Sequence, residues 1–172
     1  MDKIKSIIIE IEKLKAFGKY KEAEKIVENA LINYNDDYRL FEEIADINLY
    51  VGNLPKAMKA IEYSLELNNE SATGNYLKGF LLLSNDKPSE AIEYLEKSNK
   101  LMGNNSEVLR NLGWAYTLIG KTERGISILK RALILAPQDD LIKEDLAMAL
   151  IGSGELEKGN ILLKDIKNKA RV

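Results

Sequence analysis

The stretch that decides the fold lies at residues 106–139 and reads SEVLRNLGWAYTLIGKTERGISILKRALILAPQD. Its first half places apolar or small residues at i, i+3, i+4 and i+7, which is one stripe of an α-helix: Leu109, Leu112, Gly113 and Tyr116. Gly120 interrupts this pattern, and a second stripe of the same period runs from Gly125 to Leu135. Pro137 ends the second stripe because proline cannot continue a helix. The stretch therefore predicts two helices of about 13 residues joined by a short turn, which form an antiparallel pair.

The same pattern recurs along the chain with a period of 34 residues and without an insertion or a deletion. Residue fifteen of every unit suits a tight turn, and the five residues at this position are Gly18, Gly52, Asp86, Gly120 and Gly154. Residue twenty is always small, which lets two helices approach closely: Ala23, Ala57, Ala91, Gly125 and Gly159. A period of this length is typical of stacked repeats, in which each unit buries its apolar face only against its neighbours. We therefore predict a single array over residues 1–172, with repeats at 4–37, 38–71, 72–105, 106–139 and 140–172.

This pattern resembles the tetratricopeptide repeat over residues 4–172, which is essentially the whole chain. The resemblance is strongest in residues 106–139, where the small and apolar positions and the closing proline all match. It implies an all-α fold, a right-handed superhelical solenoid of antiparallel helix pairs. The first unit departs from the pattern because Ile11 stands where a small residue is usual. We expect either irregular packing of that helix pair or a contact between Ile11 and a surface outside the chain.

The charge balance and the absent residue types exclude several functions. Lys and Arg number 25 against 27 Asp and Glu, which leaves a formal net charge of −2 and no basic excess for nucleic acid. The sequence has no Cys and no His, so thiolate nucleophiles, disulfides, the usual zinc ligands and the commonest general base are missing. Its first residues lack the uninterrupted apolar core expected of a signal peptide, and no apolar stretch approaches roughly 20 residues, the length of a membrane span. We expect a cytoplasmic protein with no metal site, no cofactor and no membrane or nucleic-acid partner.

Catalysis is not expected from the remaining acidic residues. Three carboxylate pairs occur, at residues 36–37, 42–43 and 139–140, but adjacent residues on a helix point in different directions. Such pairs are usually solvated faces or first-turn charges that favour the helix dipole. No glycine-rich phosphate loop is present, since the glycines come one per turn at the repeat spacing. The sequence therefore favours a binding protein over an enzyme.

The family resemblance implies a groove lined by the first helix of each pair, which would hold a peptide or a helix of a partner protein. On this basis the partner-binding residues are Arg39, Tyr50, Tyr76, Phe80, Leu83, Arg110, Trp114, Leu118, Leu141, Met148 and Ile151. Residue nine of the five units changes from acidic to apolar along the chain, as Glu12, Asp46, Phe80, Trp114 and Met148. We expect an apolar partner segment with a basic end near Glu12, Glu42 and Asp46. The alternative is that the aromatic side chains pack between neighbouring first helices and only cover the core.

Two other binding modes are known or conceivable for such a fold. Some tetratricopeptide co-chaperones hold a C-terminal carboxylate with Lys and Asn at fixed positions of three units, and only Asn111 matches that clamp here. Clamp-type binding is therefore not expected. The second alternative is a scaffold that self-assembles through the solenoid ends or the groove. It is suggested by the apolar character of the final predicted helix, at Ile161, Leu162, Leu163 and Ile166.

Overall fold

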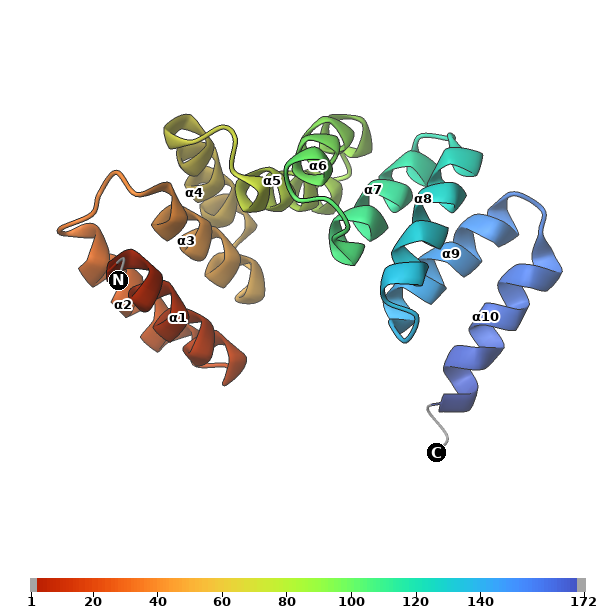
Figure 1. The fold of residues 1–172 in the computed structure, drawn as a ribbon, viewed down its shortest axis with the longest axis horizontal. Coiled ribbons are helices and arrows are strands. Elements are labelled where there is room, and N and C mark those ends of the chain that lie inside the picture. Colours follow the sequence, from red (N-terminus) through yellow and green to blue (C-terminus); the bar gives the residue numbers. More distant parts are fainter. Residues whose placement is uncertain (1–2, 170–172) are drawn as a thin grey trace. The chain divides into compact units, whose positions relative to one another are not determined.

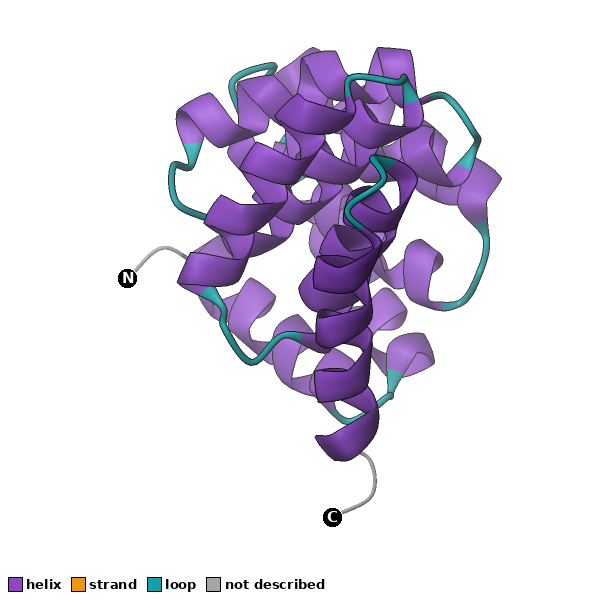
Figure 2. Cartoon of the chain, turned by 90° about the vertical axis from the view of Figure 1, so that its right-hand side faces the viewer, coloured by secondary structure: helices purple, strands orange, loops and turns teal. Residues whose placement is uncertain are grey.

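The computed structural model describes residues 3–169, and every regular element in that range is an α-helix (Figures 1 and 2). The helices alternate as first and second members of pairs, so that odd numbers are first helices. Their bounds are α1 Lys3–Ala16, α2 Tyr20–Leu31, α3 Tyr38–Tyr50, α4 Leu54–Leu67, α5 Ala72–Ser84, α6 Pro88–Leu101, α7 Ser106–Leu118, α8 Thr122–Leu135, α9 Asp140–Gly152 and α10 Leu156–Lys169. The all-α fold of paired helices predicted from the sequence is confirmed.

The contacts between residues divide the chain into two compact units, Met1–Leu81 and Leu82–Val172. Each unit has its own buried apolar clusters. The predicted organisation as one array of five repeats stays a prediction, and the last three residues of its fifth repeat lie outside the described part of the chain. Among residues 3–169, none of the helices combines the length and the apolar character needed to cross a lipid bilayer.

Polar side chains fix where several first helices begin. The Asp37 carboxylate accepts a hydrogen bond from the backbone N–H of Arg39 at the start of α3. The amide oxygen of Asn105 accepts from two backbone N–H groups at the start of α7, and the Asp139 carboxylate does the same for α9. These bonds satisfy N–H groups that have no partner inside the helix. Helices α3, α7 and α9 thus begin at residues 38, 106 and 140, and α5 begins at residue 72, where the Ser71 hydroxyl accepts from the N–H of Gly74.

Each turn inside a pair has the same backbone conformation. The φ angle of Gly120 is 79°, in the left-handed region that glycine tolerates, and Gly18, Gly52 and Gly154 are also positive. Asp86 takes the same region at 58°, so the turn forms there without a glycine. After α7, the N–H of Lys121 donates to the Tyr116 carbonyl at 2.9 Å, which closes the helix end. A single backbone geometry therefore explains why residue fifteen of each repeat is Gly or Asp.

Small residues let the two helices of a pair approach closely. A Cβ atom built on Gly125 of α8 would lie 2.3 Å from Thr117 Oγ1 and 2.7 Å from the carbonyl oxygen of Gly113, both on α7. A Cβ atom on Gly159 of α10 would lie 2.6 Å from Ile151 Cγ1 on α9. No side chain fits at these crossings without moving a helix.

The first pair fits its larger residue inside the N-terminal core. Ile11 is fully buried, in one cluster with Ala23 and Val27 of α2 and with Leu40 and Ile47 of α3. The contact between Ile11 and a surface outside the chain, one of the two alternatives drawn from the sequence, is therefore wrong. The side chain replaces the small residue as part of the core.

Candidate protein-interaction surface

In the C-terminal unit, the first helices α7 and α9 are joined by an ion pair. Arg110 Nη1 of α7 lies 3.5 Å from Asp145 Oδ2 of α9. Trp114 follows Arg110 by one helical turn, and Met148 follows Asp145 by three residues, so each lies on the same side of its helix as the pair. We call Arg110, Trp114 and Leu118 of α7, with Leu141, Asp145 and Met148 of α9, the α7–α9 surface.

The α7–α9 surface leaves much apolar area uncovered. Leu141 is 57% exposed, Met148 51% and Leu118 47%, whereas Trp114 is half-buried. An exposed group of large apolar side chains around a half-buried tryptophan is unusual on a chain that works alone. Ile151 is placed differently, because its side chain packs against Gly159 within its own helix pair.

Asp145 is perturbed by its position. Burial raises the pKa of its carboxyl to about 6, with Glu144 and Asp139 adding to the effect and Arg110 opposing it. Because the side chains of Arg110 and Asp145 are only 17% and 24% exposed, the pair is partly shielded from water. Arg110 is thus already bound within the chain at neutral pH.

In the N-terminal unit, an ion cluster joins α1 to α3. Lys15 Nζ lies 2.7 Å from Glu12 Oε1, 2.8 Å from Glu43 Oε2 and 2.6 Å from Asp46 Oδ2. The three carboxylate oxygens lie within 4.8 Å of one another, a spacing that suits a cation, and the Lys15 ammonium is that cation. Three negative charges against one positive charge leave the cluster with an excess of negative charge.

This excess is visible in the pKa values of the cluster. The pKa of Glu43 is raised to about 7, mainly by burial and also by the charges of Glu12 and Asp46, while Lys15 opposes the shift. Burial lowers the pKa of Lys15, but the charge of Glu43 and hydrogen bonds to all three carboxylates outweigh it and raise that pKa well above its usual value. The ammonium therefore keeps its charge, and Glu43 is the group that takes up a proton near neutral pH.

Glu42, the neighbour of Glu43 in the sequence, is not available to a partner protein. Its carboxylate is buried and accepts hydrogen bonds from the hydroxyls of Ser64, at 3.5 Å, and Ser71. Burial also raises its pKa. The expectation that Glu42 helps to bind a basic end of the partner is therefore corrected. As expected, Glu42 and Glu43 point in different directions, but neither belongs to a solvated face.

The other predicted residues of the N-terminal unit have partners within the chain. The Arg39 guanidinium binds Asp37, with Nη2 2.7 Å from Oδ2. Tyr50 is 62% exposed and stacks on Tyr20 of α2, with ring centroids 5.2 Å apart. Tyr76 and Phe80 are half-buried on α5, with ring centroids 6.4 Å apart. Leu83 is also half-buried on α5 but already belongs to the C-terminal unit. These side chains lie on first helices, but the neighbouring rings and charges limit how freely they can turn.

Sequence reasoning missed the partners that these side chains find within the chain. Asp145 is residue six of its unit and Arg110 is residue five of the unit before it, so the two lie 35 positions apart. Lys15 meets Asp46 across 31 positions. Opposite charges near one repeat length apart were the available signal, but many such pairs occur in a chain with 30% charged residues.

Comparison with known proteins agrees with the fold of paired helices. Residues 82–144 match a family model described as "Tetratricopeptide repeat". None of the curated proteins matches the sequence. Among solved structures, the chain is similar to MamA from Desulfovibrio magneticus RS-1, with 18% identity and a TM-score of 0.79 over 99% of this chain and 97% of that one.

Two further structures have the same fold. PilW, described as a widely conserved type IV pilus biogenesis factor, is 20% identical with a TM-score of 0.86 over 100% of this chain and 80% of that one. YrrB, described as a TPR protein with an unusual peptide-binding site, is 16% identical with a TM-score of 0.72 over 92% and 81%. At these identities the similarity concerns the fold. Together with the repeated helix pairs, it shows that the chain has the fold of tetratricopeptide-repeat proteins, and the family match itself covers residues 82–144.

Proposed function

We propose that this chain is a non-catalytic protein-interaction module that binds an apolar segment of a partner protein on the α7–α9 surface. The observation that carries the proposal is the group of exposed large side chains around Trp114. Leu118, Leu141 and Met148 are each about half exposed on two neighbouring helices of the C-terminal unit. Aromatic residues and Met are enriched at recognition surfaces, and an apolar partner segment would cover them. The proposal keeps the cytoplasmic location expected from the sequence.

The ion pair at this surface supports a prearranged binding site. Arg110 and Asp145 connect α7 and α9 one turn before Trp114, so the two helices are held beside each other without a partner. Because the surface is already ordered, a partner segment does not have to order it on binding, and the entropic cost of binding is lower. Aromatic side chains that act as interface hot spots cost about 2 kcal/mol or more when they are truncated to Ala.

The N-terminal unit supports a basic group on the partner. Glu12 and Asp46 have side chains that are 57% and 29% exposed, and they belong to the cluster in which Lys15 balances only one of three carboxylates. An exposed excess of negative charge attracts Lys or Arg of a partner and steers its approach. We include the remaining predicted residues in the proposal as further contacts: Arg39, Tyr50, Tyr76, Phe80, Leu83 and Ile151.

The fold comparison supports a peptide as the ligand, by analogy alone. YrrB is described as having an unusual peptide-binding site, which shows that this fold can carry one. The test is selection of binding peptides from a random display library against the whole chain, followed by affinity measurement with Met148→Ser. We expect at least tenfold weaker binding, because Met148 is exposed and its loss should not disturb the fold.

A matched control separates this site from general surface effects. Phe17 is 81% exposed at the turn between α1 and α2, so Phe17→Ser removes a comparable apolar side chain elsewhere. Phe17→Ser should leave the affinity unchanged. Peptides whose affinity is insensitive to Met148→Ser, or equally sensitive to both variants, would contradict the proposed surface.

A second candidate function is self-assembly, favoured by the apolar character of α10. Ile161 is 59% exposed, while Leu162 and Ile166 on the same helix are half-buried. A second copy of the chain would cover the exposed side chain of Ile161. Light scattering coupled to size-exclusion chromatography over a wide concentration range tests this. Growth in mass that Ile161→Lys abolishes would support self-assembly, and a strict monomer at high concentration would contradict it.

A further inference from the structure

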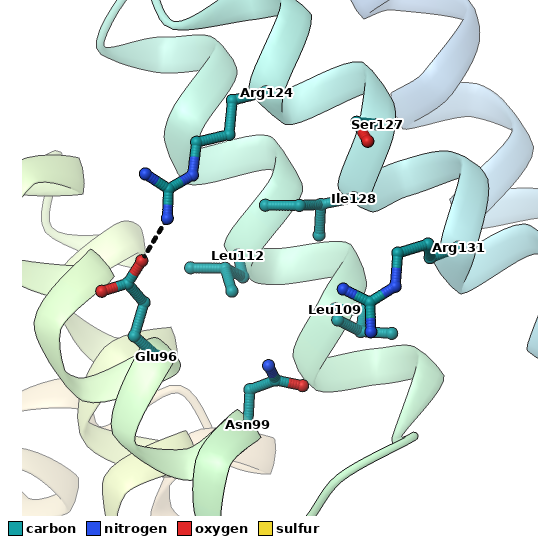
Figure 3. Close-up of a pocket in the computed structure, with 8 residues that line it drawn as sticks. All are labelled: Glu96, Asn99, Leu109, Leu112, Arg124, Ser127, Ile128 and Arg131. Carbon is teal, nitrogen blue, oxygen red and sulfur yellow. Dashed lines mark hydrogen bonds and ion pairs between the residues drawn. The ribbon is translucent and has the colours of Figure 1, made fainter.

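A cavity of about 440 Å³ opens between α6, α7 and α8 in the C-terminal unit (Figure 3). Its apolar part is formed by Leu109 and Leu112 of α7 and by Ile128 of α8, which are all buried. Polar side chains from α6 and α8 surround this floor. The volume of this cavity lies within the range of ligand-binding pockets, and most of its lining residues are polar or charged.

The two arginines of the cavity differ in their surroundings. Arg124 Nη2 lies 2.8 Å from Glu96 Oε1, and its guanidinium lies 4.1 Å from the centre of the Tyr116 ring. The Tyr116 hydroxyl donates a hydrogen bond to the same Glu96 oxygen. The charges of Arg124 and Glu96 therefore balance each other, and the polar groups at this end of the cavity already have partners within the chain.

Arg131 is the arginine whose charge is not balanced. Within residues 3–169, it has neither an ion-pair partner nor a hydrogen-bond partner. Figure 3 shows its side chain at the opposite end of the cavity from the Arg124–Glu96 pair, with Asn99 of α6 at the same end. A guanidinium beside an amide offers several N–H donors to one anionic group, and its planar shape matches a carboxylate.

A second cavity of about 200 Å³ continues from the first. It shares Leu109 and Arg131 with the larger cavity and is completed by Asn104, Ile134 and Leu135. Ile134 is 77% exposed and Leu135 44%. Arg131 thus lies between a polar cavity and a more apolar one. A ligand whose anionic group binds Arg131 would place its neighbouring groups in the two cavities.

These cavities are separate from the α7–α9 surface. On an α-helix of about 3.6 residues per turn, Leu109 and Leu112 lie on nearly the opposite side of α7 from Arg110 and Trp114. A ligand in the cavities would therefore not touch Trp114. The inference concerns a second site and does not rest on the function proposed above.

We propose that the two cavities bind an acidic segment of a partner protein, in which a Glu or Asp side chain is followed closely by a large aliphatic one. The carboxylate binds the Arg131 guanidinium, with the Asn99 amide as a second donor. The aliphatic side chain fills the smaller cavity against Ile134 and Leu135. Charge complementarity selects this occupant, because the cavity carries one unbalanced positive charge and an adjacent apolar recess.

The test uses labelled peptides with blocked ends in which Glu and Leu are separated by one, two or three Ser residues, measured by fluorescence anisotropy with the whole chain. We expect at least one spacing to bind, and its Glu→Gln version to bind at least tenfold more weakly. Arg131→Gln and Ile134→Asn should each cause a similar loss, and both side chains are exposed, so both variants should fold.

Two controls make the result specific. Lys130 is exposed beside Arg131 on α8 but does not line either cavity, so Lys130→Gln should leave binding unchanged. Trp114→Ala should also leave it unchanged, which keeps this site distinct from the α7–α9 surface. The proposal is overturned if every spacing binds more weakly than about 1 mM. It is equally overturned if the Gln peptides bind as well as the Glu peptides, or if Lys130→Gln weakens binding as much as Arg131→Gln.

Discussion

Arg110 of α7 and Asp145 of α9 form an ion pair between two successive first helices, with Arg110 Nη1 and Asp145 Oδ2 3.5 Å apart. The pair lies one turn from Trp114 and joins the helices that carry the proposed binding surface. Because burial raises the pKa of the Asp145 carboxyl to about 6, the ionised pair is complete only above that pH. We therefore expect proton uptake by Asp145 to weaken the ion pair between α7 and α9.

The first prediction is that Asp145 titrates with a pKa near 6 and that Arg110→Gln raises this pKa further. The guanidinium favours the ionised carboxylate, so its removal leaves burial and the charges of Glu144 and Asp139 unopposed. Carboxyl carbon chemical shifts recorded by NMR across the acidic range measure the value directly. A pKa close to that of an exposed Asp, or no change in the variant, would contradict the electrostatic description of the pair.

The second prediction concerns the pH dependence of stability. The carboxyls of Glu43 and Asp145 have raised pKa values in the folded chain, about 7 and about 6, so the native state holds protons that the unfolded chain releases. Stability is then fully present below their unfolded pKa values and is lost as pH rises through the folded ones. We expect the free energy of unfolding to fall by about 4 kcal/mol between pH 5 and pH 8, with the larger share from Glu43.

Urea denaturation at a series of pH values measures this dependence. Glu43→Gln should make the dependence clearly smaller, because only Asp145 of the two groups then takes up a proton in this range. Glu93 is exposed on α6, so Glu93→Gln is the matched control and should keep the slope. Stability that rises between pH 5 and pH 8 in the unaltered chain would show that Glu43 is not perturbed as the structure implies.

The third prediction is that Lys15→Met destabilises the chain by about 3 kcal/mol at pH 8, because it leaves three carboxylates together without their cation. The effect should be smaller at pH 5, where Glu43 is protonated. Lys19 forms an exposed pair with Glu22, and Lys19→Met should change stability by less than about 1 kcal/mol. Equal effects of the two substitutions in chemical denaturation would contradict the role of Lys15 in joining α1 to α3.

The fourth prediction tests the close approach of α7 and α8. Gly125→Ala should destabilise the chain by about 1–3 kcal/mol, because the new methyl group would overlap Thr117 Oγ1 and the Gly113 carbonyl oxygen. Gly103 has open space around it, so Gly103→Ala should have little effect or stabilise slightly. Thermal unfolding monitored by circular dichroism compares the two. A Gly125→Ala variant as stable as the unaltered chain would mean that the helices are not held at this distance.

The sequence predicted the fold well because the fold is local. Helix periodicity, the turn residues such as Gly120 and the small residues such as Gly125 act within a single pair. The pairing of helices and the tetratricopeptide-repeat fold are therefore confirmed, and the family model matches residues 82–144. The number of repeats stays a prediction, as do the partner-binding residues.

The sequence predicted the surroundings of charged residues poorly because those depend on distant partners. Glu42 was expected on the binding face but is buried with Ser71, which lies 29 positions away. Charged side chains are usually exposed, so periodicity alone assigns them to the solvent side. The cavity at Arg131 also left no local signal, since it arises where side chains of three helices fail to fill the space between them.

The most direct test of the proposed function is the fluorescence emission of Trp114, the single tryptophan of the chain. The measurement is a titration of the chain, at a concentration where it is monomeric, with peptides selected from the display library. Binding on the α7–α9 surface predicts a saturable shift of the emission to shorter wavelength, with a midpoint at least tenfold higher for Met148→Ser. Peptide binding that leaves the emission of Trp114 unchanged would contradict the proposed surface, and a shift caused by protein concentration alone would assign it to self-assembly.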